Sequence, residues 1–282
     1  MPIDQVFAGI PRLLHEVRER KPLVHCLTNY VTVNDCANAL LAVGASPVMA
    51  DDIGEAADIA ALANAVVINI GTLNARTIQS MFAAGKKARD LHRPVVLDPV
   101  GAGASRLRTE TALDLIKEIP FAVIRGNVSE IKALIAGGGT TRGVDADERD
   151  WTTDGLDGVA AAAGVLARRT DAVVAVTGAT DILSDGTRVL AIRNGHPLMA
   201  QITGSGCMLS AVIGAFCGAA PDHLFDAVAA ALCTMGLAGE QAAERTAKAN
   251  AGTGSFRTYL IDSLSLMDEA VLRGGMKVER RA

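Results

Sequence analysis

The sequence predicts an α/β fold in which a single domain holds an open, mostly parallel sheet flanked by helices. Two observations predict it. Short runs of β-branched and apolar residues, such as VVIN and PVVLD, alternate with longer stretches of helical character. These runs are apolar throughout, which is typical of strands that helices cover on both faces. Repeated strand–helix units of this kind imply right-handed crossovers and a parallel sheet.

The expected elements alternate along the first part of the chain. The strands are 23–27, 47–50, 65–70, 94–97, 121–124 and 172–176. The helices between them are 34–43, 55–64, 75–91, 109–119, 129–136 and 156–169. Before the first strand, an amphipathic helix would place five apolar residues on one face, namely Val6, Ile10, Leu13, Leu14 and Val17.

Two segments depart from this alternation. Residues 137–154 are polar and glycine-rich, which predicts a surface loop or a lid-like excursion. Residues 181–195 predict a hairpin with Asp185-Gly186 at its turn. The chain then becomes mostly helical, with helices expected over 207–217, 225–248 and 256–272. No composition break or linker divides the sequence, so we expect one domain over residues 1–282.

Composition excludes several classes of function. A net charge of −4 and an aromatic content of 3% argue against a nucleic-acid-binding surface. The N-terminus has no secretion-signal pattern, and no apolar run approaches the ~20 residues of a membrane span. The five cysteines form no C-x-x-C pair, which favours reduced thiols. We therefore expect a cytoplasmic protein that binds neither nucleic acid nor membrane.

The strongest local motif is TGSGC, which spans residues 203–207 and precedes the apolar run MLSAVIGAF. Glycines that open a helix let backbone N–H groups approach an anion, and the helix dipole favours negative charge there. Phosphoryl transfer needs such a site because its transition state spreads charge over the equatorial oxygens. A tight turn into a buried helix explains the same residues equally well.

Polar residues also follow other predicted strands, at the edge where open α/β sheets bind ligands. Asp98 begins DPVGAGAS, a pattern that suits a magnesium–phosphate site, although an aspartate that caps its loop would look the same. Arg125 in RGNVSE could pair with a phosphate. Asn127 and Glu130 could face a hydrated metal, but Asn-x-x-Glu is also a helix-capping pattern. Thr177 in TGATD could bracket a nucleotide phosphate or ribose.

The loops after the first two strands supply amide, hydroxyl and thioether groups that suit a small heterocycle. The sequence lacks G-x-x-x-x-G-K-[ST], the protein-kinase motifs and a G-x-S-x-G elbow. No G-x-G-x-x-G follows the first strand, which argues against a dinucleotide-binding fold. These features favour a small-molecule kinase that transfers the γ-phosphoryl group of ATP to a primary alcohol.

Together these segments resemble the ribokinase-like superfamily and, within it, the hydroxyethylthiazole kinase family. The similarity runs in the family's order from Pro22 to Phe256, and residues 137–154 carry the least of it. The combination of GASPVMA with TGSGC is the most specific part. The similar segments are LVHCLTNYVTVNDCANALLAVGASPVMADD, VVINIGTL, VVLDPVGAGASRLRT, IRGNVSEI, AVTGATDIL, ITGSGCMLSAVIGAFC and GTGSF.

The resemblance implies a reaction and a set of site residues. Members of this family phosphorylate the hydroxyl of 4-methyl-5-(2-hydroxyethyl)thiazole with MgATP, in thiamine biosynthesis and salvage. The anion hole would be Gly204, Ser205 and Gly206, and Cys207 stands where most ribokinase-like enzymes carry an aspartate base. The remaining roles would be substrate contact by Asn29, Met49 and Gly204, contact with the ATP phosphates by Arg125 and Thr177, and action through magnesium and its waters by Asp98 and Glu130.

Several alternatives stay open at this point. Cys207 could act as a base or only orient the hydroxyl, because a weak base suffices for a loose transition state. The substrate could be a hydroxymethylpyrimidine or a sugar, although GASPVMA and TGSGC argue against both. A nicotinamide-dependent oxidoreductase and a ligand-binding protein without turnover are the candidates from other classes. The resemblance also implies a homotrimer with the substrate pocket between subunits.

Overall fold

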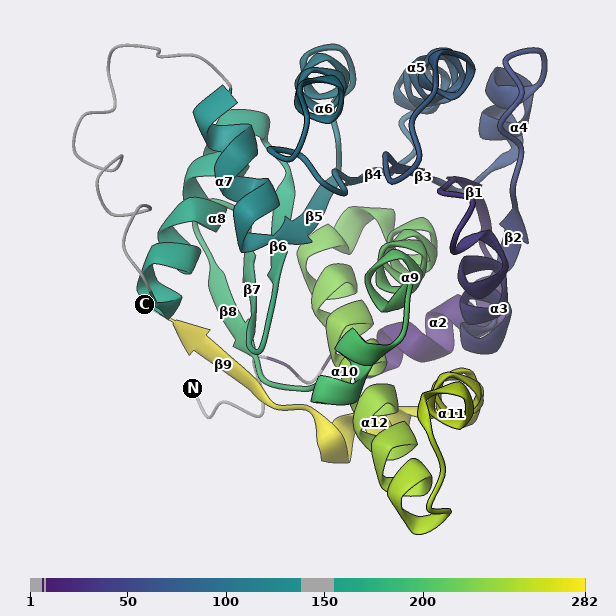
Figure 1. Ribbon diagram of the computed structural model, residues 1–282, viewed down its shortest axis with the longest axis vertical. Coiled ribbons are helices and arrows are strands. Elements are labelled where there is room, and N and C mark those ends of the chain that lie inside the picture. The colour runs from purple at the N-terminus through teal and green to yellow at the C-terminus, as the bar shows by residue number, and fades with distance from the viewer. Residues whose placement is uncertain (1–6, 8, 138–154, 282) are drawn as a thin grey trace.

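A nine-stranded sheet forms the centre of the described structure (Figure 1). The structure is a computed structural model, and it describes residues 7, 9–137 and 155–281. The strand order is β2-β1-β3-β4-β5-β6-β7-β8-β9. Neighbours from β2 to β6 are parallel, and β7, β8 and β9 each run antiparallel to the strand before them. The strands are β1 (Leu23–Leu27), β2 (Ser46–Val48), β3 (Ala65–Asn69), β4 (Val95–Asp98), β5 (Val123–Asn127), β6 (Val173–Thr177), β7 (Asp181–Ser184), β8 (Val189–Ile192) and β9 (Val278–Arg281).

Helices cover both faces of the sheet (Figure 1). One face carries α4 (Ala56–Leu62), α5 (Ala75–Asp90), α6 (Arg106–Glu118), α7 (Val128–Gly137) and α8 (Leu156–Thr170). The other carries α2 (Arg12–Arg20), α3 (Val33–Val43), α9 (Ser205–Ala219), α10 (Leu224–Lys248), α11 (Thr253–Leu266) and α12 (Glu269–Gly275). Two short 3-10 helices, Pro197–Gln201 and Pro221–His223, precede α9 and α10.

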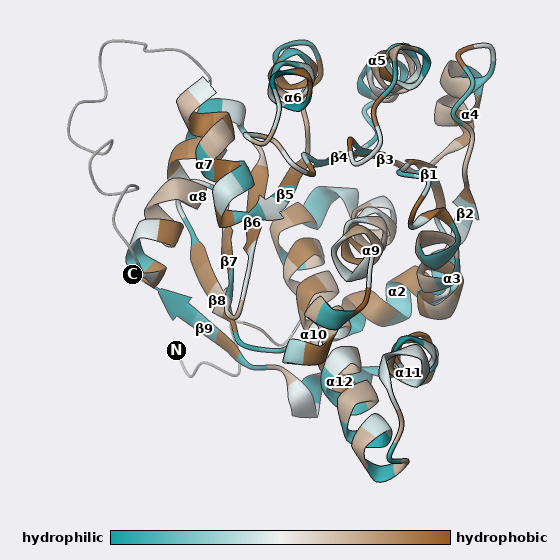
Figure 2. Cartoon of the chain, in the orientation of Figure 1, coloured by the Kyte–Doolittle hydropathy of each residue, from teal (hydrophilic) through white to brown (hydrophobic). Residues whose placement is uncertain are grey.

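The strands are apolar throughout because successive side chains enter two different cores. In β3, Val66 and Ile68 belong to the core beneath α4–α8, whereas Val67 belongs to the core beneath α9. This alternation is the geometry of a pleated strand between two helical layers. The edge strand β9 differs, since its sequence VERR is largely hydrophilic (Figure 2).

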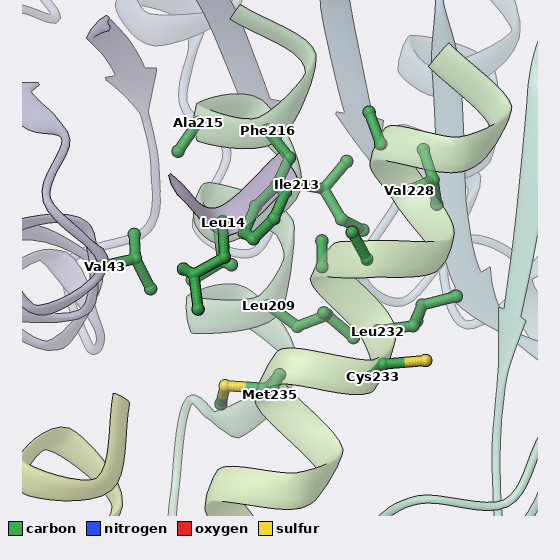
Figure 3. Packing of buried hydrophobic residues seen from close by; sticks show 14 of the residues in the cluster. Leu14, Val43, Leu209, Ile213, Ala215, Phe216, Val228, Leu232, Cys233 and Met235 are labelled. Atoms are coloured by element: carbon green, nitrogen blue, oxygen red, sulfur yellow. The ribbon is translucent and has the colours of Figure 1, made fainter. Parts of the chain in front are cut away.

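Helices α9 and α10 form the buried centre of one helical layer (Figure 3). Leu209, Ile213 and Phe216 of α9 pack with Val228 and Leu232 of α10 in one cluster. No single helix of the described residues is long and apolar enough to cross a membrane. The pair Ser205–Ala219 and Pro221–Lys248 would qualify jointly by length and composition, but it bends by 112°.

Replacing Phe216 with alanine is expected to destabilise the protein by about 3–5 kcal/mol, because it removes a buried ring and leaves a cavity. The ring is 0% exposed, whereas Leu266 on α11 is 72% exposed. Leu266→Ala is the control and should change the free energy of unfolding by less than about 0.5 kcal/mol. Urea unfolding measures both, and equal losses would contradict the packing described here.

The predicted fold class is confirmed, and each expected strand and helix of the first part of the chain is present within a few residues. Ile10, Leu13, Leu14 and Val17 are buried as predicted, while Val6 and residues 138–154 lie outside the described residues. The hairpin is also present, with Gly186 at φ 90°.

At the C-terminal end one expectation needs correction and one strand was missed. The helix expected over 256–272 is two helices, α11 and α12, because the Asp268 side chain accepts a hydrogen bond from the Val271 N–H and starts a new helix. Strand β9 was not predicted, because its charged sequence has none of the apolar character that marks the central strands.

Candidate active site

The carboxyl ends of the parallel strands meet the N-terminus of α9. Asn69 ends β3, Asp98 ends β4 and Thr177 ends β6, so the strand order places their side chains along one edge of the sheet. Cys207 lies in the first turn of α9, which packs over β1, β3 and β4. Residues distant in sequence therefore share one site, as expected for an open α/β sheet.

The N-terminus of α9 is open toward this site. The helix begins at Ser205 without a side-chain cap, so its first N–H groups have no acceptor within the helix. Gly204 has φ +85° and lies so close to Thr32 that a Cβ would come within 2.5 Å of the Thr32 Cγ2. A Cβ on Gly206 would lie 2.6 Å from Nη1 of Arg125. Gly204 is therefore required by its backbone conformation and close packing, and Gly206 lies directly against the Arg125 guanidinium.

Arg125 and Thr177, both predicted to contact ATP, are in direct contact. Nη2 of Arg125 donates to the Thr177 hydroxyl at 2.7 Å, and Nη1 lies 3.6 Å from Oδ2 of Asp98. The Arg125 side chain is 13% exposed, and its Nε has no hydrogen-bond partner among the described residues. A nearly buried guanidinium at a helix N-terminus could bind an anion, as predicted for Arg125.

Asp98 is fully buried between two polar neighbours. Its Oδ2 accepts hydrogen bonds from Nδ2 of Asn69 at 2.8 Å and from the Ser210 hydroxyl at 2.7 Å. Burial raises its pKa to about 6, although Arg125, Ser210 and Asn69 oppose the shift. Oδ1 has no partner in the described part of the chain. An unpaired carboxylate oxygen beside an anion site fits a hydrated magnesium ion that a phosphate also holds.

Glu130 binds backbone groups through both of its oxygens. Oε1 accepts from the N–H of Gly101 and Oε2 from the N–H of Asn127, each at 2.8 Å. The Asn127 side chain in turn accepts from the Glu130 N–H at 2.9 Å, so the capping alternative for Asn-x-x-Glu is present in the structure. Each carboxylate oxygen keeps a further lone pair that could accept from a metal-bound water.

The described residues contain no group of three or more His, Cys, Asp or Glu side chains that could hold a metal. Magnesium does not need one, because it usually takes one or two carboxylates together with waters and phosphates.

The Cys207 sulfur accepts two hydrogen bonds from asparagine side chains. Nδ2 of Asn29 and Nδ2 of Asn69 each lie 3.2 Å from Sγ. Because Asn69 also donates to Asp98, it bridges the thiol and the buried carboxylate. Asn69 and Ser210 were not among the predicted site residues. Asn69 ends the apolar run VVIN, so the rule that ligands bind at strand ends could have found it. Ser210 stands inside an apolar helix, where the sequence gives no such signal.

Of the three residues predicted to bind substrate, Asn29 and Met49 follow β1 and β2, and Gly204 is the N-cap of α9. Asn29 is buried, and its Oδ1 accepts from the Thr32 hydroxyl at 3.0 Å. Met49 is half-buried directly after β2, and His25 holds the next residue because its Nε2 lies 2.7 Å from the Ala50 carbonyl oxygen. The structure thus brings Asn29 to Cys207 and places Met49 directly after the neighbouring strand β2.

A cavity of about 510 Å³ extends from the start of α9 toward α10. Its lining includes Arg125, Thr177 and Gly206, which lie together, and the apolar side chains of Met199 and Met235. A ligand that carries both a charged group and a less polar part would match this lining. The cavity's lining also includes Gly178, Asp181, His196, Ser205, Leu209 and Leu232.

The sequence matches known proteins over nearly its whole length. Residues 14–270 match the model of the hydroxyethylthiazole kinase family. The chain is 51% identical to a hydroxyethylthiazole kinase of Clostridium beijerinckii, over 98% of this chain and 99% of that protein. It is 50% identical to one from Desulfovibrio desulfuricans, over 98% of both.

Solved structures agree with the fold. The hydroxyethylthiazole kinase protein of Pyrococcus horikoshii superposes with a TM-score of 0.85 at 40% identity, over 98% of this chain and 100% of that one. A ribokinase-like superfamily protein of Enterococcus faecalis shares the fold at 13% identity, with a TM-score of 0.53 over 90% of this chain and 95% of that one.

Proposed function

The chain belongs to the hydroxyethylthiazole kinase family, and we propose that it transfers the γ-phosphoryl group of ATP to the hydroxyl of 4-methyl-5-(2-hydroxyethyl)thiazole, in thiamine biosynthesis or salvage. One observation carries the proposal. The Arg125 guanidinium, the Asp98 carboxylate and the N-terminus of α9 converge beside the Cys207 thiol. This arrangement offers positive charge for a phosphate next to a group that can accept a proton.

The ATP phosphates would lie in the part of the cavity that Arg125, Thr177 and Gly206 line. Arg125 and Thr177 would bind them from one side, and the N–H groups of Ser205, Gly206 and Cys207 would stabilise the charge that develops on the transferred group. Asp98, with Glu130 through waters, would hold magnesium, which supplies neutralisation of phosphate charge when bound. The rest of the cavity would take the nucleoside.

The thiazole would lie on the other side of α9, where Asn29, Met49 and Gly204 are placed. There its hydroxyl would face Cys207. Because Asn29 and Asn69 both donate to Sγ, the two amides fix the position of the sulfur. In its thiolate form Cys207 would accept the hydroxyl proton late in the transfer and become a neutral thiol, since a loose transition state demands little proton removal early on.

Replacing Cys207 with alanine is expected to lower kcat about ten- to hundredfold, the lower part of the range for general-base catalysis, because a loose transition state demands little proton removal. Cys217→Ala is the matched control, because Cys217 is a buried cysteine of the same helix outside the site. Steady-state kinetics with MgATP and the thiazole measure both variants. A twofold loss or less at Cys207 would leave the thiol with no part in proton transfer.

We also propose that the protein is a cytoplasmic homotrimer with the substrate pocket between subunits. Tyr30 and Val31 directly follow Asn29, and they are 59% and 62% exposed. Large apolar side chains beside a binding site favour coverage by another subunit. Light scattering after size-exclusion chromatography is expected to give three times the chain mass, and a fully active monomer would contradict this.

The assay that tests the function couples ADP release to a visible readout. Hydroxyethylthiazole, hydroxymethylpyrimidine and ribose are each offered with ATP, with and without magnesium. We expect ADP release only with the thiazole and only with magnesium. Turnover of the pyrimidine or the sugar alone would keep the kinase and change the substrate, whereas no turnover by folded protein would overturn the kinase assignment.

A further inference from the structure

One peptide group beside the site is held from both of its ends. The Val100–Gly101 peptide lies in the loop that follows Asp98. Its carbonyl oxygen accepts from Nη1 of Arg108 at 2.6 Å, and its N–H donates to Oε1 of Glu130 at 2.8 Å. A cationic and an anionic side chain thus fix the two polar atoms of the same peptide plane. Hydrogen bonds to charged groups are the stronger kind.

Arg108 does more than hold this peptide. It projects from the first turn of α6, and its guanidinium also donates to the carbonyl oxygens of Ile70 at 3.2 Å and Gly71 at 2.7 Å. These two residues directly follow Asn69. One guanidinium therefore joins the segment after Asn69 to the segment after Asp98.

Two glycines make the close packing of these segments possible, Gly101 against Arg108 and Gly71 against Asn29 and Asn69. Gly101 has φ +76°, and a Cβ there would lie 3.0 Å from Cδ of Arg108. A Cβ on Gly71 would lie 2.9 Å from both Nδ2 of Asn29 and Oδ1 of Asn69. The Gly71 N–H also donates to Asn69 Oδ1 at 2.9 Å. The backbone that Arg108 holds is thus packed directly against the amides that contact Cys207.

We propose that Arg108 is a positioning residue for phosphoryl transfer, which it serves by fixing the ends of β3 and β4 relative to each other. Asn69 is the group whose place depends on this, because it donates to both the Cys207 sulfur and the Asp98 carboxylate. The planar fork of arginine suits the task, since it can reach three carbonyl oxygens at once. This inference rests on the proposed function for its kinetic readout.

Removing the Arg108 side chain should slow the chemical step without weakening the binding of ATP or thiazole to the same extent. Misplacement of reacting groups by about 1 Å can lower a rate about a hundredfold. Arg108 lies behind the strand ends, and its three acceptors are backbone carbonyls rather than ligand groups. We expect Arg108→Ala to lower kcat about ten- to hundredfold, with the KM values for ATP and thiazole within about threefold of wild type.

Arg106→Ala provides the matched control. Arg106 lies on the same helix two residues earlier, is 88% exposed and pairs with Glu110 at the surface. It should leave kcat within about twofold of wild type. Added guanidinium ion should restore part of the activity of Arg108→Ala and none of that of Arg106→Ala, because only the first variant leaves carbonyl acceptors for it.

A second readout needs neither ATP nor magnesium. Among the described cysteines, Cys207 is half-buried and the other four are buried. Iodoacetamide should therefore alkylate Cys207 first, which mass spectrometry locates. In Arg108→Ala the Asn69 side chain is expected to move away from the Cys207 sulfur and expose it. Alkylation should therefore be at least about threefold faster than in wild type. Arg106→Ala should alkylate at the wild-type rate.

A double-mutant cycle tests the coupling at the clamped peptide. Gly101→Ala should lower kcat in the wild-type background. The same substitution should lower kcat by a smaller factor in the Arg108→Ala background, where the Arg108 side chain that the new methyl group would meet is absent. Strict additivity, or an Arg108→Ala kcat within twofold of wild type, would overturn the proposal.

If Arg108→Ala does not fold, Arg108→Lys decides. Lysine keeps the charge but lacks the fork, so a folded Arg108→Lys protein with kcat at least fivefold down supports positioning, and a wild-type kcat overturns it. A wild-type protein without thiazole kinase activity would instead count against the proposed function, and the alkylation rates would still test the clamp.

Discussion

Replacing Asp98 with asparagine is expected to lower kcat about 10³-fold while the protein stays folded. The carboxylate is fully buried beside the Arg125 guanidinium, and it accepts a hydrogen bond from Ser210, one turn of α9 after Cys207. Its proposed task is to hold magnesium against the phosphates, and an amide cannot replace the negative charge that this requires. Steady-state kinetics at saturating MgATP measure the effect. Asp114→Asn, on the exposed face of α6, is the control and should retain wild-type kcat.

The same variant should not lose stability at high pH. Burial raises the pKa of Asp98 to about 6 from its ordinary value of 3.8, so the folded protein binds more protons than the unfolded chain between these values. The stability that the protonated Asp98 carboxyl contributes is therefore present below pH 3.8, and it is lost as the pH rises through about 6. Asparagine avoids the cost of the buried charge.

Melting temperatures without ATP or magnesium check this reasoning. Asp98→Asn should equal or exceed wild type at pH 8, and its advantage should shrink at pH 5. A large drop in melting temperature at pH 8 would show that the carboxylate serves mainly to hold the fold, and would remove the functional reading of the kinetic loss.

Replacing Arg125 with alanine is expected to lower kcat/KM about 10²–10³-fold and to raise the KM for ATP. The guanidinium lies between the Thr177 hydroxyl, Asp98 and Gly206, where it would contact the transferred phosphoryl group. Arg125→Lys should recover only part of the loss, because an ammonium group binds phosphate as a point charge.

Arg12→Ala, at an exposed arginine of α2, is the control and should leave kcat/KM unchanged. Isothermal titration with ATP separates binding from chemistry. An Arg125→Ala protein that binds and turns over ATP normally would show that the part of the cavity around Arg125 is not the phosphate site. Loss of Arg125 also removes a charge that lowers the pKa of Asp98, so the acid limb of kcat/KM should move to higher pH.

Much of the fold could be predicted because its central strands carry a strong local signal. Runs such as VVIN and PVVLD place apolar side chains on both faces of a strand. This pattern is typical of a sheet that helices cover on both sides. The C-terminal end was harder, since the break between α11 and α12 depends on the Asp268 cap, and β9 is held by pairing with β8 despite a charged sequence.

The site was predictable in position but not in its connections. The rule that ligands bind at strand ends led to Asp98, Arg125 and Thr177, and the structure places these three side by side. That rule could not show that Asn69 bridges Cys207 and Asp98, or that Arg108 donates to three carbonyl oxygens. Tertiary packing decides the direction in which each of these side chains points. The catalytic roles remain predictions.

The strand order has a consequence for how the protein is made. Asn29, Asp98 and Cys207 come from early, middle and late parts of the chain, and only the completed parallel sheet brings them together. Parallel pairing between distant segments forms slowly, and its intermediates expose unpaired edges. A nascent chain that lacks α9 would already contain most of the sheet and yet have no anion hole. Enzymatic competence is therefore expected to emerge in one step, only after α9 has been made and has docked on the sheet.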